Sequence, residues 1–379
     1  MPGEHAKLSA SSAHRWLACT ASPGLEAQFP DTTSPYAAEG TLAHECAERI
    51  ARYVLNMDPA LQEWPDSADH EMRDAAEAYA DLLLTRRAEA KTRCTDPLVC
   101  LEERVDFSSW VPEGFGTADC LIIADGVLEV IDFKYGKGVT VEAEDNPQMM
   151  LYALGAWHYY NEYYSIHTAR MTIFQPRLSG EPSTWDLPID ELLKWAENYL
   201  APTAREAFDG PGEYHPGEEQ CRFCRAAAQC KARGNALVEL FDEVEAGGLL
   251  SDKEIGNLLR RAQVFKSWLD STQSYVEKAL LRGTPIPGWK MVEGRSNRKI
   301  TDTAAAGQKL IEAGHPESLV FRRELETLTN LEKLVGKKKL PEVLGDLLVK
   351  PEGKPTLVPE DDKRPALQTQ TQMLEAFDE

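Results

Sequence analysis

Two aspartates and a lysine in the stretch GTADCLIIADGVLEVIDFKYG could act together on a substrate. The dipeptide Asp125-Gly126 lies between two runs of apolar and β-branched residues, a pattern that predicts a β-hairpin with a two-residue turn. Pairing that starts from this turn sets Asp119 opposite Asp132. Lys134 points to the same face as Asp132, because side chains alternate along a strand. The predicted hairpin therefore brings two carboxylates and an ammonium group together.

This arrangement needs a cation, since like charges that face each other destabilise a sheet. A hard divalent metal such as Mg²⁺ or Mn²⁺, bound through carboxylate oxygens, is the natural partner, with Lys134 beside it. The alternative is that Asp119 is a surface residue and that Asp132 and Lys134 belong to a solvated strand end. An isolated Asp-x-Lys pattern is common by chance, so the prediction of a metal site depends on the predicted pairing of Asp119 with Asp132.

Three further polar side chains could complete such a site. Gln148 and Tyr152 are four residues apart in NPQMMLYALGAWHYYNEYY, so on a helix they share one face. That helix is expected to begin with Asn146 as its N-cap and Pro147 in its first turn. His44 lies on the polar side of the helix expected for GTLAHECAERIARYVL and could supply a nitrogen ligand. A helix surface pair and a solvated histidine are the alternatives.

The eight cysteines are unevenly spread along the chain. Cys221, Cys224 and Cys230 lie close together in EEQCRFCRAAAQCKARG, whereas Cys19 is near the start of the chain. A disulfide framework is not expected, because the first residues lack the apolar core of an export signal. The trio is a candidate for metal-binding chemistry. The remaining four cysteines are expected to be small buried residues: Cys46, Cys94, Cys100 and Cys120.

Composition excludes several classes of protein. Of the 379 residues, 42% are hydrophobic and 27% are charged, which excludes collagen, a coiled coil and wholesale disorder. No apolar run approaches the roughly 20 residues that a membrane span needs, so a cytoplasmic protein is expected. The net charge of −21 argues against indiscriminate coating of nucleic acid, although a basic channel could exist within an acidic body. The G-x-x-x-x-G-K-[ST] loop of ATP-driven motors is absent from the sequence.

Periodicity predicts the elements that position these residues. Helices are expected over 40–55, 69–90, 146–164 and 190–208, and strands over 99–107, 116–124, 127–133 and 169–178. This succession predicts an α/β unit with a mainly helical N-terminal part. The sequence then changes to helical segments and a basic strand pair over 288–300. We expect three parts: the α/β unit of 1–235, an α+β accessory region of 236–350 and a loosely ordered tail of 351–379.

Together these positions resemble the RecB-like branch of the PD-(D/E)XK nucleases. His44 in GTLAHE matches the helical histidine of that family, and Asp119 in GTAD matches its first metal-binding aspartate. Asp132 and Lys134 in IDFK match the Asp-x-Lys core. The resemblance implies that the carbonyl of Phe133, between acid and lysine, also binds metal. It further implies a central mixed sheet flanked by helices.

The helix residues and the cysteines extend the resemblance. Gln148 and Tyr152 match the family's Q-x-x-x-Y helix, which implies that they orient the lysine or contact the DNA backbone. One N-terminal cysteine and three C-terminal ones look like the iron–sulfur staple of AddB-type nucleases and of CRISPR-adaptation exonucleases. This implies a [4Fe–4S] cluster held by four thiolates: those of Cys19, Cys221, Cys224 and Cys230. A structural Zn²⁺ in the same site is the alternative, and Cys19 could also be a buried residue without a ligand.

The resemblance implies a metal-dependent DNA exonuclease that hydrolyses phosphodiester bonds in phage recombination or replication. A single-strand annealing or binding protein is the expected partner, and the oligomeric state is left open. The alternatives are a structure-specific or restriction-type endonuclease, and a catalytically silent DNA-binding module with a structural metal cluster. The accessory region is expected to grip single-stranded DNA, since an aromatic among basic residues suits such a strand. The expected contacts are Trp289, Lys290, Arg295, Arg298 and Lys299.

Overall fold

The computed structural model describes residues 6–30, 35–58, 60, 63–178, 180–242, 251–292, 302–313, 316–321, 327–336 and 339–348. The chain divides into two compact units, the first comprising 1–245 and 267–291 and the second 246–266 and 292–379. All the carboxylates and cysteines singled out above belong to the first unit.

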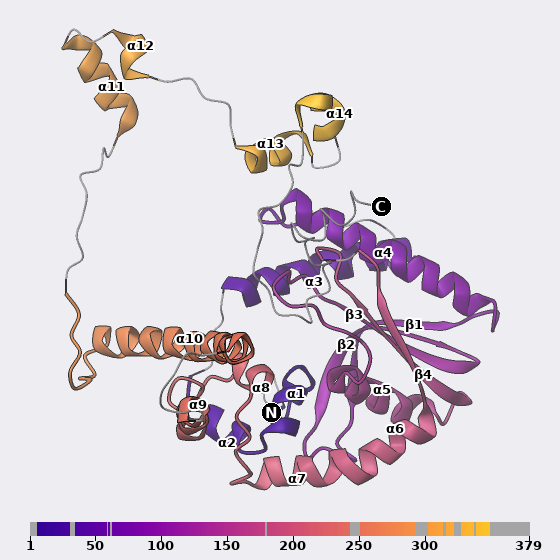
Figure 1. The fold of residues 1–379 in the computed structure, drawn as a ribbon. Coiled ribbons are helices and arrows are strands. Elements are labelled where there is room, and N and C mark those ends of the chain that lie inside the picture. The colour runs from indigo at the N-terminus through magenta and orange to yellow at the C-terminus, as the bar shows by residue number, and fades with distance from the viewer. Residues whose placement is uncertain are drawn as a thin grey trace, which may run out of the picture. The chain divides into compact units, whose positions relative to one another are not determined.

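A mixed five-stranded sheet forms the centre of the first unit (Figure 1). Its strands lie side by side in chain order: β1 (Leu98–Asp106), β2 (Phe115–Ala124), β3 (Gly126–Phe133), β4 (Ile166–Phe174) and β5 (Ser183–Pro188). Only β3 and β4 are parallel, and α5 (Pro147–Tyr160) connects them, as a parallel pair requires a crossover. The α/β fold with a central mixed sheet is therefore confirmed. The edge strand β5 was not predicted.

The hairpin of β2 and β3 has the predicted register. The observed pairs are Ala124 with Val127, Ile123 with Leu128, and Leu121 with Val130. Gly126 in the turn has a φ of 81°, a conformation that glycine adopts without a steric penalty. The paired stretch ends at Cys120 and Ile131, one step before Asp119 and Asp132. The two aspartates thus lie where the hairpin ladder stops.

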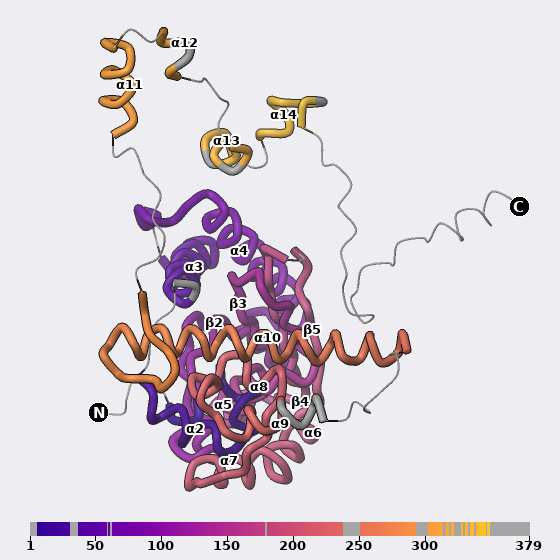
Figure 2. Tube along the Cα trace, turned by 60° about the vertical axis from the view of Figure 1, so that its left-hand side comes forward, coloured from indigo at the N-terminus to yellow at the C-terminus, as the bar shows by residue number. Residues whose placement is uncertain are grey.

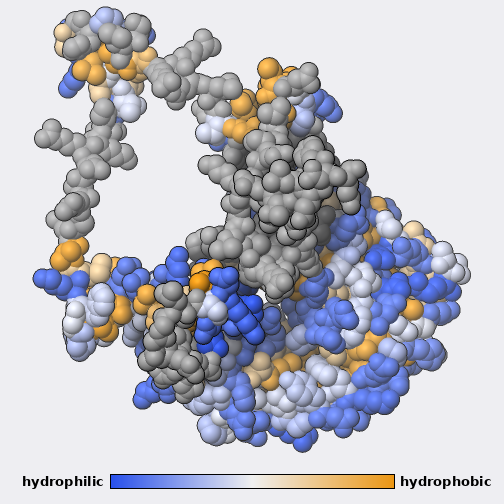
Figure 3. Space-filling model, viewed as in Figure 1, coloured by the Kyte–Doolittle hydropathy of each residue, from blue (hydrophilic) through white to orange (hydrophobic). Residues whose placement is uncertain are grey.

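Helices cover both faces of the sheet and bury one apolar core on each (Figure 1). One face carries α1 (Ala13–Ala18), α5, α6 (Ile189–Trp195) and α7 (Ala201–Asp209), and the other carries α3 (Pro35–Val54) and α4 (His70–Lys91). Leu121 and Ile123 belong to the first core, whereas Cys120 and Ile122 belong to the second. This alternation along β2 agrees with the pleat of a strand. The face of the unit seen in Figure 3 is mainly hydrophilic, with scattered apolar residues.

Two helices of the first unit begin at side-chain caps. The carboxylate of Asp69 accepts a hydrogen bond from Met72 N at the start of α4. The amide oxygen of Asn146 accepts from Gln148 N and Met149 N at the start of α5, which confirms the predicted cap. Such caps stabilise a helix by about 1 kcal/mol each. The second cap also sets the rotation of α5, and with it the direction of the Gln148 side chain.

Short helices from the two ends of this unit pack together. The N-terminal η1 (Ala10–Ser12), α1 and α2 (Ser22–Glu26) lie beside α8 (Glu218–Arg222), as Figures 1 and 2 show. The segment 196–200 (η2) joins α6 to α7, and α9 (Lys231–Asp242) follows the cysteine trio.

The described residues beyond 250 form helices and turns. They are α10 (Asp252–Leu281), α11 (Thr303–Glu312), α12 (Glu317–Val320), α13 (Leu328–Val335), α14 (Leu340–Leu344) and η3 (Gly345–Leu347). Of the predicted strand pair over 288–300, residues 288–292 form no strand and 293–300 lie outside the described residues. No described helix combines the length and the apolar character that crossing a membrane requires.

Candidate active site

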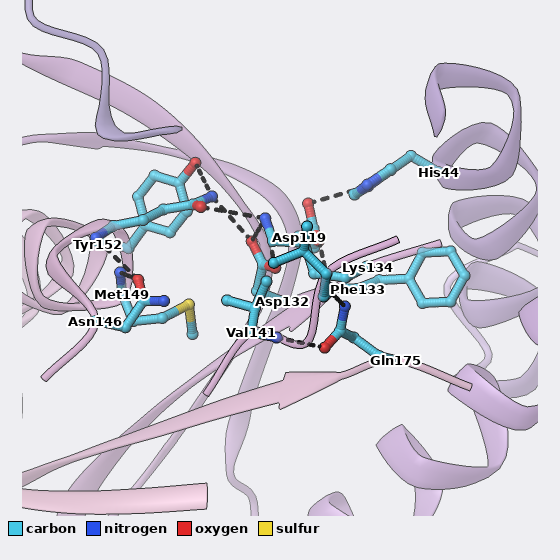
Figure 4. Close-up of polar contacts among 12 residues, drawn as sticks. His44, Asp119, Asp132, Phe133, Lys134, Val141, Asn146, Met149, Tyr152 and Gln175 are labelled. Carbon is cyan, nitrogen blue, oxygen red and sulfur yellow. Dashed lines mark hydrogen bonds and ion pairs between the residues drawn. The ribbon is translucent and has the colours of Figure 1, made fainter. Parts of the chain in front are cut away.

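The middle of β2, the end of β3 and the first turns of α5 bring the predicted polar residues together (Figure 4). Asp119 lies near the middle of β2, Asp132 near the end of β3, and Lys134 directly after β3. His44 reaches this cluster from α3 on one side, and Tyr152 from α5 on the other. The site therefore combines side chains from both helical layers with the strands between them.

A chain of polar contacts links the second aspartate to α5. The Nζ of Lys134 is 2.8 Å from Oδ2 of Asp132 and donates to Oδ1 of the same carboxylate at 3.1 Å. The amide of Gln148 accepts from Lys134 Nζ at 3.1 Å and donates to Asp132 Oδ1 at 3.0 Å. The same Gln148 Nε2 is 3.2 Å from the Tyr152 hydroxyl. Gln148 thus holds the acid and the lysine in one geometry.

The first aspartate joins the strands to α3. Asp119 Oδ2 accepts from the backbone N–H of Phe133 at 2.7 Å, while its Oδ1 is 3.3 Å from Nδ1 of His44. The ring of Phe133 contacts the imidazole of His44 edge-on, with centroids 5.5 Å apart. Asp119 and Asp132 are therefore held on either side of the Phe133 backbone by different partners.

Glu102 belongs to the site and was not predicted. One ligand atom each from His44, Glu102 and Asp119 lie within 4.8 Å of one another, the only such group of three among the described residues. Glu102 has a φ of 51°, which is uncommon for a residue with a Cβ. The β1–β2 ladder is recorded on both sides of Glu102 and Asp119 but not between them. This irregularity in β1 accompanies the placement of the carboxylate beside Asp119.

Charge and burial shift the pKa values of the cluster. Burial raises the pKa of Asp132, Lys134 opposes the shift, and the charge of Asp119 adds to it. Burial lowers the pKa of Lys134, but Asp132 outweighs that effect and the pKa is raised overall. Asp119 likewise outweighs burial at His44, whose pKa is raised. Burial, followed by the charge of Asp119, raises the pKa of Glu102 to about 7. The cluster thus holds three carboxylates, those of Glu102, Asp119 and Asp132, against one lysine and one histidine.

These residues fit a divalent metal ion. Asp132 is 2% exposed, and its Oδ2 is 2.8 Å from the Lys134 ammonium. Beside it, His44, Glu102 and Asp119 each offer one ligand atom, and these atoms lie within 4.8 Å of one another. Carboxylate oxygens with one imidazole nitrogen are donors that suit Mg²⁺ and Mn²⁺. Burial and the Asp132 charge also raise the pKa of Tyr152, so its hydroxyl stays protonated and can donate.

The four cysteines of the predicted staple line one pocket, together with Leu25, Tyr214 and His215. Cys221 is buried, whereas Cys19, Cys224 and Cys230 are half-buried. Burial raises the pKa of the Cys19 thiol, and burial followed by the charge of Glu26 raises that of Cys224 to about 11. No three of the four sulfur atoms lie mutually within 4.8 Å, judged over the residues that the structure describes. Of the other cysteines, Cys46 and Cys120 are buried as predicted, and Cys94 and Cys100 are half-buried.

Direct contacts between distant segments form this pocket. Thr20 Oγ1 donates to Glu206 and accepts from Glu213 N at 2.7 Å, which ties the residue after Cys19 to the loop before α8. Glu26 is 7% exposed and accepts from Arg15 Nε at 3.0 Å and from Arg225 N at 2.9 Å. These contacts hold the N-terminal segment that carries Cys19 beside the segment that carries Cys221, Cys224 and Cys230.

The candidate DNA contacts of the accessory region are placed only in part. Trp289 is 66% exposed among the described residues, and Lys290 is also exposed. Arg295, Arg298 and Lys299 lie outside the described residues.

Comparison with solved structures finds weak likenesses. The chain is similar to LHK-Exo in complex with dAMP at 16% identity and a TM-score of 0.23, over 52% of this chain and 91% of that one. It is similar to an alkaline exonuclease (LHK-Exo) from Laribacter hongkongensis at 15% identity and a TM-score of 0.21, over 52% of this chain and 93% of that one. It is similar to SSO0001 at 13% identity and a TM-score of 0.21, over 56% of this chain and 95% of that one. Residues 5–365, nearly the whole chain, match the model of the family described as a protein of unknown function (DUF2800), and the chain belongs to that family.

Proposed function

We propose that this protein is a divalent-metal-dependent deoxyribonuclease that hydrolyses phosphodiester bonds. One observation carries the proposal: the buried Asp132 carboxylate faces Lys134 and Gln148 at 3.1 Å or less, while Asp119 contacts His44 and the backbone N–H of Phe133 next to Asp132. Oxygen ligands beside a fixed ammonium group suit a reaction in which negative charge develops on a phosphate. The hydrogen bonds and the ion pair among these side chains would keep this geometry before the substrate binds.

Each residue has a role that follows from its contacts. His44, Asp119, Asp132 and the Phe133 carbonyl would hold Mg²⁺ or Mn²⁺, with Glu102 as a further acidic neighbour. The metal, when bound, lowers the pKa of a water molecule and polarises the phosphate. Lys134 is protonated beside Asp132, so its ammonium would neutralise charge on the phosphate. Gln148 would keep Lys134 in place, and the Tyr152 hydroxyl would donate to the DNA backbone.

We propose an exonuclease that acts in phage recombination or replication, together with a single-strand annealing or binding protein. The sequence resemblance supports these finer assignments. A structure-specific or restriction-type endonuclease on the same fold differs in one testable respect, since it cuts closed circles. The complete set of Asp119, Asp132 and Lys134, with its mutual contacts, argues against a catalytically silent DNA-binding module.

We further propose that Cys19, Cys221, Cys224 and Cys230 hold a [4Fe–4S] cluster rather than Zn²⁺. The resemblance of the four-cysteine pattern to an iron–sulfur staple supports this choice, since four thiolates can hold such a cluster. The same four thiolates could hold Zn²⁺ in a closed tetrahedral site. Metal and sulfide analysis of anaerobically purified protein distinguishes the two.

The accessory region of 236–350, followed by the tail of 351–379, remains in our proposal the part that grips DNA. The 66% exposure of Trp289 beside Lys290 supports this role, because an exposed aromatic can stack on an unpaired base.

The activity is tested with anaerobically purified full-length protein and its Asp132→Asn variant, each with Mg²⁺ or Mn²⁺. The substrates are end-labelled linear DNA and closed circles, single- and double-stranded. Asp190→Asn is the matched control, because this aspartate lies on α6 and pairs only with Lys194 on the surface. We expect metal-dependent loss of linear DNA alone, retained in the control and absent in Asp132→Asn.

Two other results would change the assignment. Cleavage of closed circles would move the assignment to an endonuclease. Tight DNA binding without cleavage in either metal would support the silent module and reject the nuclease.

A further inference from the structure

A cleft of about 530 Å³ opens beside the candidate active site. Lys134 and Gln148 line one part of it, and Arg222 and Phe223 line another. Arg222 and Phe223 are the two residues between Cys221 and Cys224 in the sequence. The cysteine pocket and the carboxylate site therefore meet at this cleft through side chains of one short loop.

The backbone next to Phe223 is hydrogen-bonded, whereas the ring of Phe223 is exposed. The backbone N–H of Arg225, two residues further on, donates to the buried Glu26 at 2.9 Å, and Cys224 N donates to Cys221 O at 3.3 Å. Yet Phe223 is 62% exposed, although an aromatic ring gains free energy when it is buried. An exposed aromatic ring that lines an open cleft can offer its face to a flat partner.

The charges of the cleft indicate which part of a nucleic acid this surface can bind. Four acidic residues and only two lysines or arginines line it: Glu142, Glu144, Asp145 and Glu219 against Lys134 and Arg222. Arg222 is also 3.9 Å from Glu218. Such a lining does not attract the phosphate backbone by charge alone. A base, in contrast, is uncharged, and its face can stack on an aromatic ring such as that of Phe223.

We propose that Phe223 is a stacking platform for an unpaired DNA base, which holds a single strand in the cleft beside Lys134. Bases of a duplex already stack on one another, so the platform selects single-stranded DNA over duplex. The inference rests on the proposed function in that its ligand is DNA. It gives the Cys221–Cys224 loop a role in substrate binding in addition to its role in holding metal.

The test measures binding without cleavage, by fluorescence anisotropy, in an Asp132→Asn background without added divalent metal. The probes are a labelled 12-nucleotide oligothymidylate, an abasic strand of equal length and a 12-base-pair duplex. Phe223→Ala is compared with Phe223→Trp and with Tyr163→Ala, which removes a 70% exposed aromatic outside the cleft. Metal and sulfide content, measured for each variant, shows whether the cysteine loop is intact.

We expect Phe223→Ala to weaken oligothymidylate binding by roughly 5- to 150-fold, the factor for one base–aromatic stack. Phe223→Trp and Tyr163→Ala should bind as the parent does, and the abasic strand should bind Phe223→Ala and the parent equally. Unchanged oligothymidylate binding by Phe223→Ala at normal metal content would overturn the inference, as would an equal loss for the abasic strand. Cleavage by the otherwise unaltered protein is scored separately, so either proposal can fail while the other stands.

Discussion

The carboxylate site and the cysteine pocket of the first unit are built in opposite ways. The carboxylate site lies largely within one hairpin and the helix that follows it, and its side chains satisfy one another. The cysteine pocket joins segments about 200 residues apart, a separation at which loop closure costs the most entropy. Two of its sulfur atoms have backbone contacts, Cys19 with Glu213 O at 3.6 Å and Cys221 with Gly217 N at 3.4 Å.

This difference indicates at which of the two sites a bound metal would contribute to folding stability. Register and packing position the carboxylates, so we expect a metal ion there to add chemistry more than structure. The cysteines lie on short helices and loops, so a group bound to them would stabilise the fold directly. The predictions below test this contrast.

The largest effect on stability is expected for Cys221→Ser. A group that links Cys19 to Cys221 closes a loop of about 200 residues, which on the chain-entropy scale for a cross-link stabilises by about 5 kcal/mol. Anaerobic urea unfolding measures the loss. Cys94→Ser is the control, since Cys94 is half-buried outside the pocket. Similar losses in the two variants would show that the pocket holds no stabilising group.

A smaller loss of stability is expected when the ammonium group of Lys134 is removed from the carboxylate site. Lys134→Met leaves the buried Asp132 carboxylate without its charge partner, which costs roughly 3 kcal/mol in unfolding free energy. Adding Asp132→Asn removes the uncompensated charge, so the double variant should be more stable than Lys134→Met alone. Urea unfolding of the unaltered protein, both single variants and the double variant gives the coupling free energy. Additive losses would mean that the pair does not act as a unit.

The smallest effect is a pH dependence from Glu102. Because the pKa of Glu102 is raised to about 7, the folded state binds more protons than the unfolded state between pH 4.5 and 7. Stability therefore falls as the pH rises through this window. In metal-free buffer, Glu102→Gln should melt a few degrees above the unaltered protein above pH 7 and at the same temperature below pH 4.5.

Adding a divalent metal to the same melting experiment gives a second test of Glu102. Mg²⁺ should raise the melting temperature of the unaltered protein more than that of Glu102→Gln, because only the former presents the full carboxylate group. A melting difference that does not change with pH would contradict the predicted role of the Glu102 charge.

Much of the carboxylate site could be predicted because it depends on local rules. The Asp125-Gly126 turn defines the register of the hairpin, and one register settles which residues face one another. The spacing of Gln148 and Tyr152 puts them on one face of α5, and Asn146 marks where that helix begins. These features follow from residue types a few positions apart.

Other parts depended on contacts between distant segments. Strand β5 is only six residues long and ends in Pro188, so its alternation is too short to stand out in the sequence. It is stabilised by pairing with β4, including an Arg170–Asp186 ion pair at 2.7 Å. Glu102 reaches Asp119 only because β1 lies beside β2 with an irregular backbone at that point. Of the strand pair expected over 288–300, residues 288–292 form no strand, and 293–300 lie outside the described residues.

The sequence by itself determined the α/β class, the hairpin register, the cap of α5 and the set of residue types available for metal chemistry. Only the tertiary structure decided that His44 meets Asp119, that Glu102 joins them, and that Phe223 faces the cleft of Lys134. The physical reason is that backbone geometry over a few residues follows from local sterics and hydrogen bonding. Contacts between separate elements depend on how whole helices and strands pack, which no short pattern specifies.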